Sequence, residues 1–219
     1  MGRHADVWAA LGMFSGSPEE GAQVLKELGE ANKAGAARRA QLHSSIEGKR
    51  RETESLGITR NQVYVSNAVY LEDEGPAPKF DGDPIMDIFI TSRPGNRLPH
   101  AWLGGTFPGK LLSTIDLVGH GAFTVITGHG GEAWKKAAEH ATKVLGVPIN
   151  SYSIGWGLDY HDVYRDWFKK REIEEDGVLL VRPDRYVAWR STKLIPDAEE
   201  KLLRVFERIL SRQEIPRLM

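Results

Sequence analysis

Hydrophobic positions in the second half of the chain follow the two periods that distinguish strands from helices. Residues 123–127 form an apolar, β-branched run typical of a buried strand, and residues 149–154 form a second such run. Between them, residues 132–145 carry apolar side chains on one helical face, and Gly146 and Pro148 end that helix. The order strand, helix, strand predicts two adjacent parallel strands.

The pattern beyond the second strand predicts three further elements. A helix is expected after Asp159, which would cap it, and residues 178–181 and 186–189 are expected to pair as a hairpin. Asp197 and Glu200 have the spacing of a capping box at the start of a final amphipathic helix. The predicted element order is therefore βαβαββα, which is the order of the thioredoxin fold.

An extra hairpin is predicted before this order. Residues 101–103 form its first strand, residues 104–109 its glycine-rich turn and residues 111–117 its return. Residues 85–219 are thus expected to form an α/β, thioredoxin-like domain with an extra N-terminal hairpin. The thioredoxin Cys-x-x-Cys motif would fall at residues 128–131, which read Gly-His-Gly-Gly, so thiol redox chemistry is excluded.

Residues 1–75 are expected to form a helical segment that ends in a strand. A short helix is predicted near residues 5–11, and Ser17 begins a second one, with proline and glutamate in its first turn. A third helix over residues 36–56 is rich in charge and has a thin apolar stripe, and residues 62–71 have strand composition. Because short helices are marginal in water without packing, this segment is expected to need a partner surface.

Composition removes several classes of function. The 219 residues contain 29 Lys and Arg against 30 Asp and Glu, so no strong field draws the chain to nucleic acid or to an anionic membrane. The absence of cysteine excludes disulfides and thiolate catalysis. No apolar run is long enough for a membrane span and no signal peptide is evident, so a cytoplasmic location is expected.

Three residues are candidates for proton chemistry. Asp116 and His120 lie four positions apart, and His100 precedes a strand that is expected to pair with the strand before Asp116. A carboxylate beside an imidazole is a common general-base arrangement. The alternative, favoured by the usual role of such residues, is that they satisfy backbone groups at strand ends.

The histidine spacing matches no zinc pattern, so no metal site is expected. The glycines next to His129 indicate a tight turn before a helix rather than a phosphate site.

Three longer motifs resemble a known family. PGNRLPHAWL, STIDLVGHGAFTVITGHGGEAW and GVLLVRPDRYVAWRS are similar to the C-terminal third of the flavin-dependent phenol and dichlorophenol hydroxylases, single-component aromatic monooxygenases that use FAD and NADPH. The resemblance runs from about Ser17 to about Ser191. It implies a thioredoxin-like C-terminal domain and a domain boundary near residues 75–84. It also implies that the flavin is held by a domain preceding the matched region, so no cofactor is expected in this chain alone.

Three functions remain open on this basis. The first is the C-terminal domain of an FAD-dependent aromatic monooxygenase, not redox-competent alone, with a structural or subunit-contact role. The second is a stand-alone, cofactor-free enzyme, such as an isomerase, cyclase or dehydratase, acting on an aromatic or polyketide-like small molecule through Asp116, His120 and His100. The third is a non-catalytic interaction module. The expected partner is a second copy, giving a homodimer, or the missing flavin-binding domain.

Overall fold

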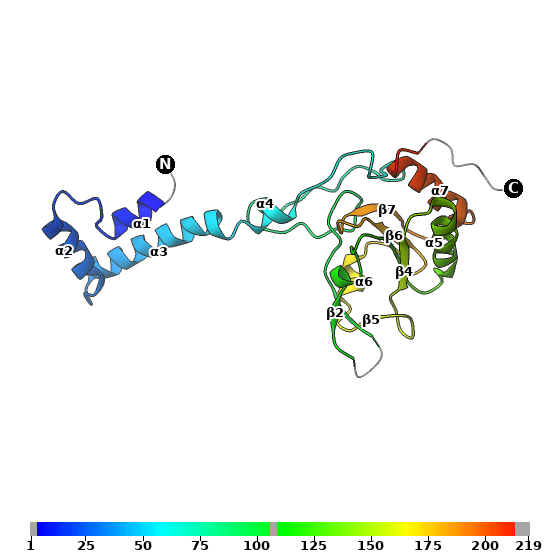
Figure 1. Cartoon of the computed structure of the whole chain (residues 1–219). Helices are drawn as coiled ribbons and strands as arrows, with labels where there is room; N and C mark the ends of the chain where they lie inside the picture. Colours follow the sequence, from blue (N-terminus) through cyan, green and yellow to red (C-terminus); the bar gives the residue numbers. More distant parts are fainter. Residues whose placement is uncertain (1–3, 106–108, 213–219) are drawn as a thin grey trace. The chain divides into compact units, whose positions relative to one another are not determined.

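The computed structural model describes residues 4–105 and 109–212, and these form two compact units (Figure 1). The first unit contains the residues up to Thr59 together with Asp81–Ile88. The second contains Arg60–Phe80 and the residues from Phe89 onward. The segment before residue 75 is therefore divided between the two units, and each unit is described by itself.

The first unit is helical, with α1 (His4–Ala10), α2 (Pro18–Leu28), α3 (Lys33–Thr53) and all but the last residue of α4 (Leu56–Arg60). The start of α2 is the predicted one, since the Ser17 side chain accepts the backbone N–H of Glu20 at 3.2 Å. The third helix begins and ends earlier than predicted. Asn32 caps it by accepting the N–H of Gly35 at 2.8 Å, and α4 follows after a break as a separate short helix.

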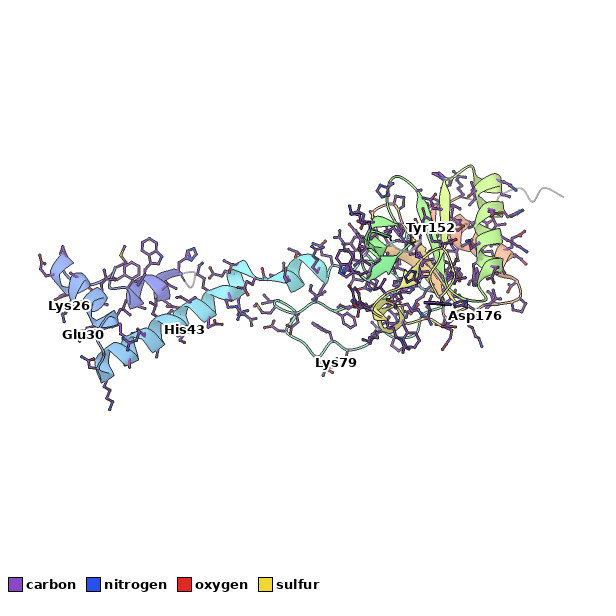
Figure 2. All side chains as sticks on the ribbon, turned by 90° about the horizontal axis from the view of Figure 1, so that it is seen from below. Lys26, Glu30, His43, Lys79, Tyr152 and Asp176 are labelled. Atoms are coloured by element: carbon purple, nitrogen blue, oxygen red, sulfur yellow. The ribbon has the colours of Figure 1, made fainter. Side chains whose placement is uncertain are left out.

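The helices of the first unit enclose almost no apolar interior. Among its described residues, Ala10 is the one buried residue with an apolar side chain, and α2 buries none. Large apolar side chains are instead exposed, among them Trp8, Met13, Phe14, Leu25 and Ile46. Figure 2 shows Lys26 on α2, His43 on α3 and Glu30 between these two helices. No helix in the described part of the chain is long and apolar enough to cross a membrane.

The second unit is built around a four-stranded sheet of order β4-β3-β6-β7. Strands β3 (Phe123–Thr127) and β4 (Ile149–Ser153) are parallel neighbours, as predicted. On the other side of β3, β6 (Val178–Val181) runs antiparallel, and it forms the predicted hairpin with β7 (Val187–Ser191). All four residues of β6 are buried, because this central strand is covered on both faces.

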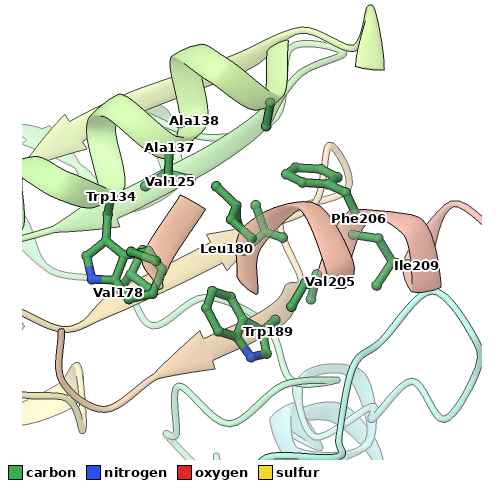
Figure 3. Packing of buried hydrophobic residues seen from close by; sticks show 14 of the residues in the cluster. Val125, Trp134, Ala137, Ala138, Val178, Leu180, Trp189, Val205, Phe206 and Ile209 are labelled. Atoms are coloured by element: carbon green, nitrogen blue, oxygen red, sulfur yellow. The ribbon is translucent and has the colours of Figure 1, made fainter. Parts of the chain in front are cut away.

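Helices α5 (Glu132–Leu145) and α7 (Ala198–Ile209) pack together over one face of this sheet (Figure 1). Their apolar faces meet alternate strand residues in one core cluster, where the rings of Trp134 and Trp189 lie 5.6 Å apart (Figure 3). The buried indole N–H of Trp134 donates to the backbone oxygen of Asp176 at 3.0 Å. The left-handed residue Gly146 ends α5, as its position in the sequence predicts.

A second core cluster lies on the opposite face, against a three-stranded sheet of order β2-β1-β5. The predicted extra hairpin is formed by β1 (Trp102–Gly104) and β2 (Leu112–Ser113), although part of its turn, residues 106–108, lies outside the described residues. The return strand is shorter than predicted because the 3-10 helix η1 (Thr114–Asp116) follows at once. Strand β5 (His161–Asp162) pairs with β1 on its other side.

The strand predicted over residues 62–71 is wrong. This stretch has no regular structure. Two of its backbone N–H groups donate to other segments, that of Tyr64 to Gly95 and that of Tyr70 to Ala188, both at 2.8 Å. Of its three β-branched residues, Val69 is buried, whereas Val63 and Val65 are exposed, Val65 by 82%. Composition favoured a strand here, but no neighbouring strand supplies a ladder of hydrogen bonds.

Two predicted helix caps are also wrong. The Asp159 carboxylate accepts the N–H and the hydroxyl of Ser153, both at 2.8 Å, and so closes a loop after β4. The next helix, α6 (Asp166–Lys170), begins later. Asp197 precedes α7 without a side-chain cap and pairs with Arg204 at 2.9 Å instead.

The chain order of the second unit after its first hairpin is β3, α5, β4, β5, α6, β6, β7, α7. Apart from the two-residue strand β5, this is the order βαβαββα predicted from the sequence. The unit is thus a mixed α/β structure with two sheets and covering helices. Its assignment to the thioredoxin-like fold stays a prediction.

Candidate functional site

The three residues proposed for proton transfer lie around the start of η1, and all three are exposed. His100 Nδ1 lies 2.6 Å from the Ser113 hydroxyl, and its ring meets the Trp102 ring edge-on at 4.8 Å. Ser113 is buried, and its oxygen also accepts the N–H of Ile115 at 3.0 Å as the cap of η1. His100 is therefore connected to the cap of a 3-10 turn.

Asp116 and His120 are not brought together as carboxylate and imidazole. The Asp116 carboxylate accepts the backbone N–H of Ser113 at 2.8 Å and completes a capping box. His120, in a left-handed conformation with φ 56°, places Nε2 3.3 Å from the backbone oxygen of Asp116. Both side chains thus contact backbone groups, the alternative that the sequence left open. Among residues 4–105 and 109–212, no group of three acidic or histidine side chains could hold a metal ion.

The glycine-rich segment between β3 and α5 is a tight turn. A Cβ atom at Gly131 would lie 1.8 Å from Thr127 Oγ1, so a side chain there would displace the end of β3. That hydroxyl is itself fixed, because it donates to the backbone oxygen of Gly177 at 2.6 Å. Gly131 is therefore required by packing, which accounts for this glycine without a bound phosphate.

A cavity of about 460 Å³ opens next to this turn, at the carboxyl ends of the parallel strands β3 and β4. Its lining includes His129 after β3, Trp156 after β4, His161 and Asp162 of β5, and Phe168 and Arg171 at α6. Sequence reasoning did not single out this cavity. The available signal was its position, because open sheets with parallel strands bind ligands at the carboxyl ends of those strands.

A charged cluster joins residues far apart in the sequence. Glu74 forms ion pairs with Arg93 at 2.9 Å and with Arg190 of β7 at 2.7 Å, and the Glu74 side chain is only 8% exposed. Glu172 pairs with Arg190 at 2.9 Å and also accepts the N–H of Ser92. Burial lowers the pKa of Arg190, but its hydrogen bonds to Glu74 and Glu172 outweigh burial and raise that pKa above its ordinary value. The cluster fastens the irregular loop around Glu74 to the sheet.

Comparison with known proteins identifies the class to which this architecture belongs. Residues 91–212 match the family described as "Aromatic-ring hydroxylase, C-terminal", and the chain therefore belongs to that family. The matched region contains both sheets, both core clusters and the cavity. The resemblance inferred from the three sequence motifs is confirmed.

Particular relatives agree with this assignment. The chain is 35% identical over 212 residues to the 2,4-dichlorophenol 6-monooxygenase of Delftia acidovorans, which covers 96% of this chain and 36% of the relative. It is 36% identical over 200 residues to the phenol 2-monooxygenase of Pseudomonas sp. (strain EST1001), covering 91% and 32%. The structure of the flavin-dependent monooxygenase PieE with FAD and substrate matches with a TM-score of 0.81 and 35% identity, over 96% of this chain and 36% of that one. The chain thus spans about a third of the length of these relatives.

Proposed function

We propose that this chain serves as the C-terminal part of an FAD-dependent aromatic monooxygenase of the phenol hydroxylase type, with a structural or subunit-contact role. The observation that carries the proposal is the family match, together with 35% identity to a dichlorophenol monooxygenase over nearly the whole chain. The match covers only 36% of that relative. In this proposal, the rest of such an enzyme holds the flavin and carries out the hydroxylation.

The chain by itself is proposed neither to retain FAD nor to oxidise NADPH. Binding of the FAD pyrophosphate usually requires glycines that let a helix N-terminus approach it after a strand. The turn at Gly131 offers this order, but its glycine is accounted for by the close approach of Thr127. Purified chain is therefore expected to be colourless. A flavin absorption band corresponding to about one FAD per chain would contradict the proposal.

The partner is proposed to be the flavin-binding domain, or a second copy of the chain in a homodimer. Support comes from the first unit, where Trp8 and Leu25 on helices α1 and α2, and Met13 and Phe14 in the turn between them, are exposed. Exposed apolar groups of this size favour contact with another protein surface. A cytoplasmic location stays a prediction.

A fusion experiment tests the proposed role. The Delftia relative would be truncated where its match to this chain begins, and three proteins would be compared: the truncated relative, the same protein with its own C-terminal part restored, and the same protein fused to this chain. We expect the first to retain FAD less well on purification, because its flavin-binding part lacks the supporting surface of the C-terminal part. Both fusions are expected to retain FAD and to oxidise NADPH when dichlorophenol is added. Restoration by the relative's own part but not by this chain would contradict the proposal.

A stand-alone, cofactor-free activity is the second candidate, favoured by one contact. The 2.6 Å separation of His100 Nδ1 and the Ser113 oxygen joins an exposed imidazole to a hydroxyl close to Asp116. In this proposal, His100, Asp116 and His120 move protons on an aromatic small molecule. Replacing His100 or His120 by Gln would then abolish turnover. Unchanged turnover in both variants would leave the non-catalytic roles, including that of an interaction module.

A further inference from the structure

Strand β4 forms one edge of the four-stranded sheet (Figure 1). Next to its two ends, the carbonyl of Pro148 accepts from β3 at 3.0 Å and the N–H of Ile154 donates to β3 at 2.9 Å. Because the backbone groups of successive strand residues point to opposite sides, those of Ile149, Ser151 and Ser153 point away from β3. These three residues therefore form the outer edge of the sheet.

The loop after β4 covers only the last of the three. The N–H of Ser153 donates to the Asp159 carboxylate at 2.8 Å, and the Ser153 carbonyl accepts the N–H of Tyr160 at 3.1 Å. Among the described residues, none bonds to the outward backbone groups of Ile149 and Ser151. Each of these two residues thus presents one N–H and one carbonyl to a possible partner strand.

The opposite edge of the same sheet is covered by this chain. On β7, the carbonyl of Val187 accepts from Gly95 at 2.8 Å, and its N–H donates to Asn96 at 2.9 Å. The next carbonyl, that of Ala188, accepts from Tyr70 at 2.8 Å. Irregular segments of the second unit therefore close the edge at β7, while the edge at β4 stays open.

The sequence of β4 lacks the features that usually prevent an edge strand from pairing. Such strands commonly carry a charged side chain, a proline or a bulge. Strand β4 reads Ile-Asn-Ser-Tyr-Ser and pairs with β3 without a bulge. The nearest charges along the chain are Lys143 and Asp159, and Asp159 is already paired with Lys135 at 2.7 Å. An uncharged strand of this kind can lie beside a copy of itself without like-charge repulsion.

We propose that β4 pairs antiparallel with β4 of a second copy of this chain, about a two-fold axis at Asn150. In this register Ile149 lies opposite Ser151 of the second copy, and the same pair recurs on the other side of the axis. Each pair exchanges two hydrogen bonds, so all the open backbone groups of Ile149 and Ser151 are satisfied. A register with Ser151 opposite itself would place Ile149 opposite Ser153, whose groups are already bonded.

This pairing rests on the homodimer named in the proposed function and specifies the surface that forms it. Its test is independent of the flavin, because it uses the isolated chain and measures association only. Failure of the fusion experiment would leave the pairing of β4 intact, and a monomeric chain would leave the fusion result intact.

A single cysteine tests the register. The side chain of Asn150 is exposed, and on the two-fold axis it faces Asn150 of the second copy as a non-hydrogen-bonded pair. The Cα atoms of such a pair lie about 4.5 Å apart, a separation that a disulfide spans. Because the chain has no cysteine, Asn150→Cys introduces one thiol, and mild oxidation is expected to give a covalent dimer on a non-reducing gel.

The matched control is Lys193→Cys, which places an equally exposed thiol shortly after β7. It is expected to stay largely monomeric under the same oxidation. Equal cross-linking of the two variants would show random collision of thiols and would overturn the proposal.

Charge at the axis tests the contact without a covalent bond. Sedimentation of the unaltered chain is expected to show a reversible dimer at rising concentration. Asn150→Lys and Asn150→Glu each place like charges opposite one another, so each variant alone is expected to dimerise about tenfold more weakly. An equimolar mixture of the two is expected to regain the dimer, because lysine then faces glutamate.

Circular dichroism would establish that each variant is folded. A dimer that persists unchanged in both charge variants would assign the contact to another surface, such as the exposed helices of the first unit, and would overturn the proposal. A strict monomer that also fails to cross-link through Asn150→Cys would overturn it as well, and would leave the β4 edge to a strand of another protein.

Discussion

At the scale of single residues, Asp159 illustrates how a side chain can take a different role from the one its sequence position indicates. It is placed like a helix cap, yet it closes the loop after β4 through Ser153 and pairs with Lys135 at 2.7 Å. Burial raises the pKa of Asp159, but hydrogen bonds from Lys135 and Ser153 outweigh burial and lower that pKa below its ordinary value. The ionised form is therefore the one that stabilises the fold.

Replacing Asp159 by Ala is expected to lower the free energy of unfolding at neutral pH by about 1 kcal/mol, because the two Ser153 hydrogen bonds are lost. A lowered pKa contributes stability above the unfolded-state value of about 4, and that contribution disappears as pH falls through the folded-state pKa. Urea unfolding of both proteins should therefore differ at pH 7 and converge in acid.

The control for this change is Asp197→Ala, which removes a half-exposed carboxylate paired with Arg204. Exposed ion pairs contribute little, so a loss of less than about 0.5 kcal/mol is expected. An Asp159 variant no less stable than this control would show that the loop closes without its carboxylate.

At the scale of elements, the loop before residue 80 is held by charge rather than by a strand ladder. Glu74 is nearly buried between Arg93 and Arg190, while Trp189 donates its indole N–H to Asp73 at 2.7 Å. Lys201 of α7 also pairs with Asp73, at 2.8 Å. A few side chains on β7 and α7 thus position a segment that forms no regular structure.

Glu74→Gln is expected to destabilise the second unit by about 2 kcal/mol, because the largely buried guanidinium of Arg93 would lose its ionic partner and that of Arg190 would keep only Glu172. Denaturant unfolding measures the loss, and hydrogen exchange should show faster opening of the loop. Glu72→Gln is the matched control, since Glu72 is 64% exposed and lies 3.6 Å from Arg208. Equal stability of the two variants would contradict the role given to the Glu74 cluster.

At the scale of the whole molecule, the two units differ in how much they bury. Helix α5 buries five residues and α2 buries none, although both show an amphipathic pattern. Since helices of this length depend on packing for stability, the first unit is expected to be the less stable one in the isolated chain.

Hydrogen exchange of the isolated chain is expected to be much faster in α2 than in α5. In the fusion with the truncated relative, α2 should become protected while α5 changes little, because only the exposed apolar helices gain a partner. Protection of α2 equal to that of α5 in the isolated chain would contradict the expected need for a partner surface.

Much of the second unit could be predicted because its determinants are local. The run 123–127 specifies a strand, the amphipathic pattern 132–145 specifies a helix, and Gly146 specifies where that helix ends. All three features appear where they were predicted. The parallel pairing of β3 with β4 follows from the connection between them. The family resemblance was also contained in the sequence, since its motifs are long and specific.

The sequence by itself therefore determined the order of elements in the second unit and the family of the chain. Tertiary structure alone decided which polar groups meet, because partners such as Glu74 and Arg190, or Asp73 and Lys201, are set by packing rather than by spacing along the chain. It also decided that residues 62–71 form no strand, since the contact of this segment with β7 is a single backbone hydrogen bond, from Tyr70 to Ala188, and not a ladder.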